Sequence, residues 1–190
     1  MARIRTFIAV AIGPAIQERA SALQEKLALT AAGVKWVEPG SMHITLLFLG
    51  QVAELDLVPI CRIVNKGVRG IAPFDMAIGG LGVFPTPRRP KVLWAGVKEG
   101  AESMRQIHAH LEAPLLEQGG YRREERGYNP HLTLGRITHD ERTSAWGPLL
   151  ANYANWEGGT TRVEEVLVMS SELRRDGPVY TVMGRARLND

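Results

Sequence analysis

A short pattern occurs twice in this chain and constrains its fold more than any other feature. Residues 43–46 and 131–134 both read histidine, one apolar residue, threonine and leucine. Before each motif comes the same succession of an apolar run, a stretch with helical periodicity and a loop; the runs are residues 7–12 and 92–97. The sequence therefore predicts one strand–helix–strand unit used twice. Two copies related by a pseudo-twofold axis would bring the two histidines face to face.

Both motifs are expected to be strands, because their apolar and polar residues alternate and include several β-formers. At a period of two, each histidine shares a face with its threonine, about 7 Å away. His43 with Thr45, and His131 with Thr133, could then reach one tetrahedral anion, while the leucines fix the strand to a core. The plainer alternative is a pair of histidines that only cap a buried face. Duplication of the whole pattern favours the functional interpretation.

The other elements follow from periodicity and from turn residues. We expect helices opening at Pro14 and covering 55–68 and 101–118, a short or broken helix at 140–153, and strands at 34–37, 163–170 and 179–186. Residues 74–84, with a glycine pair at 79–80, predict a hairpin or a bulged strand pair. Pro114 is expected to kink or shorten its helix, and a second glycine pair at 119–120 to end it.

The length predicts one domain, or two small lobes that share a core, over residues 1–190, and the composition predicts a soluble protein. Its 45% hydrophobic and 23% charged residues are ordinary for a globular protein. A net charge of +3 permits an anionic partner without identifying one. The single cysteine, Cys61, excludes an intrachain disulfide and fits a reducing cytoplasm. No apolar run approaches the roughly 20 residues needed to cross a bilayer, and we interpret residues 7–12 as a strand rather than part of a signal peptide. We expect a cytoplasmic monomer.

Two imidazoles that face each other form an acid–base couple, because at one pH near 6.5 one ring can be neutral and the other protonated. Threonine hydroxyls can donate to phosphoryl oxygens. A zinc site would need three or four close ligands, and the only close pair, His108 and His110, lies at helix positions that do not share a face. We expect both to be surface residues. Phosphate-loop and nucleophile-elbow motifs are absent from the sequence. We expect neither a metal nor another cofactor.

Two basic segments lie between the two motifs. Residues 85–91 form a proline-rich loop with two arginines and a lysine, and Arg122, Arg123 and Arg126 precede the second motif. The loop is either a solvated connector or a rim that contacts phosphate, and the sequence leaves both interpretations open.

The chain resembles members of the two-histidine (2H) phosphoesterase superfamily. Within the superfamily it resembles the bacterial and archaeal RNA 2',3'-cyclic phosphodiesterases, also known as 2'-5' RNA ligases. The residues that carry the resemblance are His43-Ile44-Thr45-Leu46, His131-Leu132-Thr133-Leu134, the Phe-Leu-Gly at 48–50, Pro85, the segment 90–94 and the Asn-Pro at 129–130. It implies an α+β fold of two pseudo-symmetric lobes, with antiparallel sheets lining a central groove and helices outside. It also implies metal-free opening of a 2',3'-cyclic phosphate at an RNA 3' end, which leaves a 2'-phosphate.

The resemblance further implies roles for single residues. His43 would donate a proton to the departing oxygen, His131 would accept one from water, and Arg136 would contact phosphate. Plain alternation places Arg136 on the face opposite His131, unless a bulge near Gly135 turns it back. Phe7, Trp94 and Tyr128 are candidates for base stacking, although we expect core packing for each.

The sequence leaves two alternative functions open. The first is the same chemistry on another substrate, such as ADP-ribose cyclic phosphate or 2'-5' oligonucleotides, with RNA ligation as a weak reverse reaction. The second is an RNA-binding module that grips phosphate without turnover. The paired threonines beside paired histidines argue against the second, because binding alone does not require two proton-transfer groups.

Overall fold

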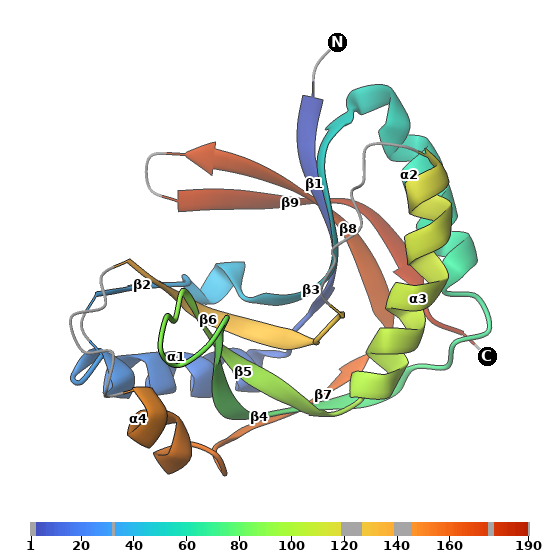
Figure 1. The fold of residues 1–190 in the computed structure, drawn as a ribbon. Helices are drawn as coiled ribbons and strands as arrows, with labels where there is room; N and C mark the ends of the chain where they lie inside the picture. The colour runs from blue at the N-terminus through green and yellow to red at the C-terminus, as the bar shows by residue number, and fades with distance from the viewer. Residues whose placement is uncertain (1–2, 32, 119–126, 139–145, 175–176, 190) are drawn as a thin grey trace.

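The computed structural model describes residues 3–31, 33–118, 127–138, 146–174 and 177–189 (Figure 1). Its elements are β1 (Arg3–Ala11), α1 (Pro14–Ala28), β2 (Val34–Trp36), β3 (His43–Ala53), α2 (Leu57–Gly67), β4 (Phe74–Phe84), β5 (Val92–Glu99), α3 (Ala101–Gln118), β6 (His131–Ile137), α4 (Trp146–Asn152), β7 (Glu157–Val163), β8 (Glu165–Arg174) and β9 (Gly177–Arg187). Short 3₁₀ turns, Pro39–Ser41 and Glu54–Asp56, precede β3 and α2. These described residues form one nine-stranded sheet.

The order of strands in the sheet is nearly symmetric about its centre. It runs β7-β4-β5-β6-β3-β1-β8-β9, with β2 added to β6, and neighbouring strands are antiparallel. The two motif strands, β3 and β6, lie at the centre and are registered through Ile44 opposite Leu132. We call β3, β1, β8 and β9 the first lobe, and β6, β5, β4 and β7 the second lobe. This arrangement confirms the α+β fold with two pseudo-symmetric lobes.

The helices cover one face of the sheet. In Figure 1, α1 lies along the second lobe, where it packs on β7, and α2 and α3 pack together beside the first lobe. Each repeat helix buries one stripe at helical spacing. The stripe of α1 is Ile16, Ala20, Leu23 and Leu27, and that of α3 is Met104, Ile107, Leu111 and Leu115. Ile44 and Leu132 are fully buried in the same core, so the histidines and threonines that alternate with them lie on the other face of the sheet.

The structure differs from the expected local structure at three places. Residues 74–84 form one continuous strand, β4, and not a hairpin, because Gly80 at φ 66° makes a bulge and donates its N–H to the Trp156 carbonyl over 2.8 Å. No sequence pattern indicated β7, whose glycines at 158 and 159 are poor strand formers. Pro114 does not shorten α3, which continues to Gln118.

The ends of two expected helices fall outside the described residues, namely the glycine pair at 119–120 and residues 140–145. Among the helices that are described, none is both long and apolar enough to cross a membrane.

Candidate functional site

The two motif histidines are held in the same way. Nδ1 of His43 lies 2.8 Å from the Ser41 carbonyl, and Nδ1 of His131 lies 2.7 Å from the Asn129 carbonyl. A carbonyl can only accept a hydrogen bond, so Nδ1 carries a proton in both rings. In the neutral form of each ring, Nε2 is then the basic nitrogen. Both imidazoles are thus oriented to exchange a proton through Nε2.

The pairing of the central strands brings the two motifs together. Ile44 lies opposite Leu132. If this antiparallel register is continued by one residue in each direction, each histidine falls opposite the threonine of the other motif. Side chains opposite one another on antiparallel strands have Cβ atoms about 5 Å apart. His43, Thr45, His131 and Thr133 therefore form a compact group on the face away from the helices. All four side chains are half-buried, and the two imidazoles interact electrostatically.

A β-bulge interrupts both motif strands at the same place. The shifts of register fall at Leu46, against β1, and at Leu134, against β5. Each of these leucines is buried together with the residue after it, and the next residue, Phe48 or Arg136, is exposed. The bulge returns Phe48 and Arg136 to the face of the histidines. Plain alternation was therefore wrong for Arg136.

The charge of Arg136 acts within the site. Burial raises the pKa of Tyr180, and Arg136 and then Arg5 partly offset that rise by favouring the phenolate. Tyr180 lies edge-on to the His43 ring, with ring centroids 5.1 Å apart. Arg136 is thus close enough to influence a side chain that contacts His43.

Phe7 packs on the other side of His43, with ring centroids 4.8 Å apart. Phe7 is only 2% exposed. Its ring therefore packs inside the protein, as expected, and forms a wall of the site that a base cannot reach for stacking. Tyr180 was not identified from the sequence. Nothing near it along the chain points to His43, and only the pairing of β9 with β8, and of β8 with β1, brings it there.

His131 has an aromatic wall of its own. Phe84 lies edge-on at 5.0 Å and Trp94 at 6.1 Å between ring centroids. The Trp94 indole also packs against Phe84 and passes over Gly82, where a Cβ atom would collide with it. Its Nε1 is buried and has no hydrogen-bond partner among the described residues. Trp94 is half-buried and packs in the wall of the site, not in the hydrophobic core where it was expected. Phe84 was not identified from the sequence.

The surroundings of His43 in the protein favour its neutral form. Burial lowers the pKa of His43, the hydrogen bond to the Ser41 carbonyl raises it, and the charge of His131 lowers it, with a net decrease. A phosphate anion beside the ring would oppose this decrease by stabilising the imidazolium.

Tyr128 connects the two motifs. Its hydroxyl donates to the backbone carbonyl of Thr45 over 3.1 Å, and its ring stacks on His108 at 4.4 Å. Burial raises the pKa of Tyr128 well above its usual range, so the hydroxyl remains a donor at neutral pH. The next residue, Asn129, supplies the carbonyl that holds His131. His108 is therefore half-buried in this cluster and is not a plain surface residue, whereas His110 is exposed.

In the described part of the chain, no three His, Cys, Asp or Glu side chains are grouped closely enough to hold a metal ion. The loop at 85–89 is mostly exposed, and its backbone closes through Lys91 N–H to the Phe84 carbonyl at 2.6 Å. The basic residues Arg122, Arg123 and Arg126 lie outside the described residues.

Known proteins are similar to this chain in sequence. The family model described as LigT like Phosphoesterase matches residues 10–94 and 96–180, so each match contains one motif. The chain is 38% identical to an RNA 2',3'-cyclic phosphodiesterase of Methanothermobacter thermautotrophicus, with 98% of this chain and 100% of that protein covered. It is 32% identical to a protein of the same name from Aquifex aeolicus, with 95% of each covered.

Two solved structures have a similar fold. A protein of Thermus thermophilus aligns with a TM-score of 0.82 and 28% identity over 97% of this chain and 98% of its own. E. coli LigT complexed with 3'-AMP aligns with the same TM-score and 21% identity over 99% of both chains, a likeness of fold alone. From the matched residues and the identities to its relatives, the chain belongs to the LigT-like phosphoesterase family.

Proposed function

We propose that this protein is a hydrolase that opens the 2',3'-cyclic phosphate at an RNA 3' end and leaves a 2'-phosphate. The observation that carries the proposal is the pairing of the two motif strands at Ile44 and Leu132, with the Nδ1 atoms of both neighbouring histidines bonded to backbone carbonyls. The names of the relatives support the substrate class.

In the proposed reaction His131 Nε2 accepts a proton from water as the water oxygen bonds to phosphorus. The bond from phosphorus to the 3' oxygen breaks, and the His43 imidazolium donates its proton to that oxygen. Thr45 and Thr133 donate hydrogen bonds to the non-bridging oxygens, and Arg136 balances their negative charge. Each turnover ends with His43 neutral and His131 protonated, so proton exchange with solvent restores the starting state.

Substrate binding favours the protonated form of His43. The protein environment lowers the pKa of His43, whereas a proton donor must carry a proton. The cyclic phosphate brings one negative charge next to the ring, and this charge raises the pKa of His43 towards the value a donor needs. Substrate binding and protonation of His43 are therefore coupled.

The direct test uses an oligoribonucleotide that ends in a 2',3'-cyclic phosphate, incubated with the protein in EDTA across pH 5 to 9. We expect turnover with a bell-shaped pH profile and a 2'-phosphate product. Binding of this RNA without turnover at any pH would favour the RNA-binding module. Turnover of ADP-ribose cyclic phosphate or of 2'-5' oligonucleotides in its place would move the proposal to another substrate. Ligation, as the reverse reaction, would use the same groups.

A further inference from the structure

The face that carries the histidines extends beyond them along the first lobe. We propose that Arg5, Phe48 and Tyr180, here called the upstream patch, bind the nucleotide that immediately precedes the cyclic phosphate end. The inference rests on the proposed function and deepens it, because it makes the enzyme selective for oligonucleotide ends over cyclic mononucleotides.

The register of three strands places the patch. Arg5 is two residues from Phe7 in β1 and so lies on the same face, roughly 7 Å further from His43 along the strand. Arg5 pairs with Ser171 of β8, which in turn pairs with Tyr180 of β9. These positions form a row across the lobe. The effect of the Arg5 charge on the Tyr180 hydroxyl agrees with this row.

An exposed aromatic ring completes the patch. Phe48 is 48% exposed, and its ring centroid lies 6.0 Å from that of Phe7. Since Phe7 in turn contacts both His43 and Tyr180, the exposed face of Phe48 continues the wall of the histidine site. A nucleobase that stacks on an aromatic side chain gains contact of this kind without sequence preference.

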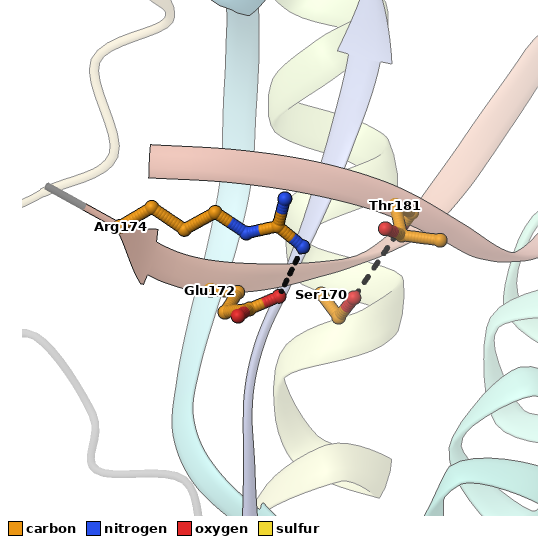
Figure 2. Close-up of polar contacts among 4 residues, drawn as sticks. All are labelled: Ser170, Glu172, Arg174 and Thr181. Atoms are coloured by element: carbon orange, nitrogen blue, oxygen red, sulfur yellow. Dashed lines mark hydrogen bonds and ion pairs between the residues drawn. The ribbon is translucent and has the colours of Figure 1, made fainter. Parts of the chain in front are cut away.

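The cations of this face have no carboxylate partners within the described chain. Arg5 and Arg136 are exposed, and neither is among the arginines that form ion pairs there, which are Arg105, Arg162, Arg174 and Arg185. Figure 2 shows how the β8–β9 hairpin differs: Arg174 is paired with Glu172 over 3.0 Å. Alternation puts that pair on the face away from Tyr180. The site face therefore presents positive charge that a phosphodiester would neutralise.

The second lobe lacks an equivalent patch in its described residues. Phe7 lies opposite Phe48 in the first lobe, and Val92 lies opposite Arg136 in the second. Val92 is therefore the pseudo-symmetric equivalent of Phe7. Pro90, two residues before Val92, is then the equivalent of Arg5, two residues before Phe7. Pro90 is buried and has neither charge nor N–H donor. On the second lobe, the arginines that could bind the upstream nucleotide in place of Arg5 are Arg88 and Arg89 of the exposed loop.

The experiment compares two substrates, adenosine 2',3'-cyclic monophosphate and the dinucleotide ApA with the same cyclic end. The measured quantity is the ratio of kcat/KM for the dinucleotide to kcat/KM for the mononucleotide. We expect Arg5→Gln to lower this ratio about tenfold, mainly through KM, because a charge-assisted hydrogen bond is lost. Phe48→Leu should lower it by a similar factor through lost stacking. Arg62→Gln, on the exposed surface of α2, is the matched control and should leave the ratio as in the wild type.

Salt dependence gives a second readout that a merely structural effect would not move. For single strands, each neutralised phosphate contributes about −0.7 to the slope of log affinity against log salt. With the dinucleotide, the slope of log affinity against log salt should be about 0.7 less steep for Arg5→Gln than for the wild type. Melting temperatures equal to the wild type would show that both variants are folded.

The inference is overturned if neither variant changes the ratio. It is also overturned if the ratio falls in Arg88→Gln/Arg89→Gln and not in Arg5→Gln, because the upstream nucleotide would then lie along the second lobe. Failure of the wild type to convert either substrate would instead contradict the proposed function itself.

Discussion

The hydroxyl of Tyr128 ties the segment before the second motif to the strand of the first. Tyr128→Phe removes this hydroxyl and keeps the ring that stacks on His108. The Thr45 carbonyl then loses a donor in a half-buried setting, which costs about 1–2 kcal/mol of unfolding free energy. For a protein of this size that corresponds to a fall in Tm of roughly 2–8 °C. We expect kcat to fall by up to about tenfold with little change in KM, because the reacting groups are less well aligned.

The raised pKa of Tyr128 adds a pH dependence of known sign. Its phenol ionises near pH 10 in the unfolded chain and at higher pH in the folded one. The contribution of the protonated Tyr128 hydroxyl to the free energy of unfolding is therefore fully present below about pH 10, and it is lost as the pH rises above that value. The stability difference between wild type and Tyr128→Phe should therefore shrink between pH 8 and pH 10.5.

Denaturant unfolding at both pH values, together with steady-state kinetics, measures these effects. Tyr153→Phe is the matched control, because the hydrogen bonds of Tyr153 among the described residues are made by its backbone. Equal unfolding free energies and equal kcat values for the two variants would refute a role for Tyr128 in joining the motifs.

Three further predictions concern the walls and charges of the site. Because burial lowers the pKa of His43, wild-type stability should fall as the pH drops below about 6.5, and chemical denaturation should show this loss reduced in His43→Asn. Gly82→Ala should cost about 1–3 kcal/mol in thermal unfolding and shift Trp94 fluorescence by displacing the indole, whereas Gly40→Ala, with open space around it, should do neither. Arg136→Gln should lower kcat/KM on the cyclic phosphate by roughly 10- to 100-fold and Arg136→Lys by less, since a point charge remains; equal losses would contradict a charge role.

Much of the fold could be predicted because its elements carry their own periodicity. The run at 7–12, the stripe that begins at Ile16 and the motif strands were all found where expected. β7 could not be predicted from the sequence, because its glycines have a weak preference for strands and only the tertiary pairing with β4 makes this segment a strand. At 74–84 the hairpin was the wrong one of two alternatives, and the bulge of the other is present, because the glycine pair bends a strand without ending it.

The candidate site was predictable only as far as local alternation reaches. His43 and His131 stand out by duplication, but the face of Arg136 depends on a bulge at Leu134 that the pattern does not encode. Tyr180 and Phe84 reach the histidines through strand pairing over long sequence separations. A single sequence contains no local signal for such contacts.

The central claim is that His43 and His131 act as an acid–base pair through Nε2. His→Asn at either position keeps an N–H near the place of Nδ1, so the bond to the Ser41 or Asn129 carbonyl can persist while Nε2 is lost. The decisive measurement is the pH profile of kcat/KM on the cyclic-phosphate RNA for wild type and both variants. We predict a bell for the wild type, a loss on the order of 10²–10⁴ in each variant, and the absence of the acidic limb in His131→Asn and of the alkaline limb in His43→Asn. Wild-type turnover in both variants, or a full bell in either, would contradict the account.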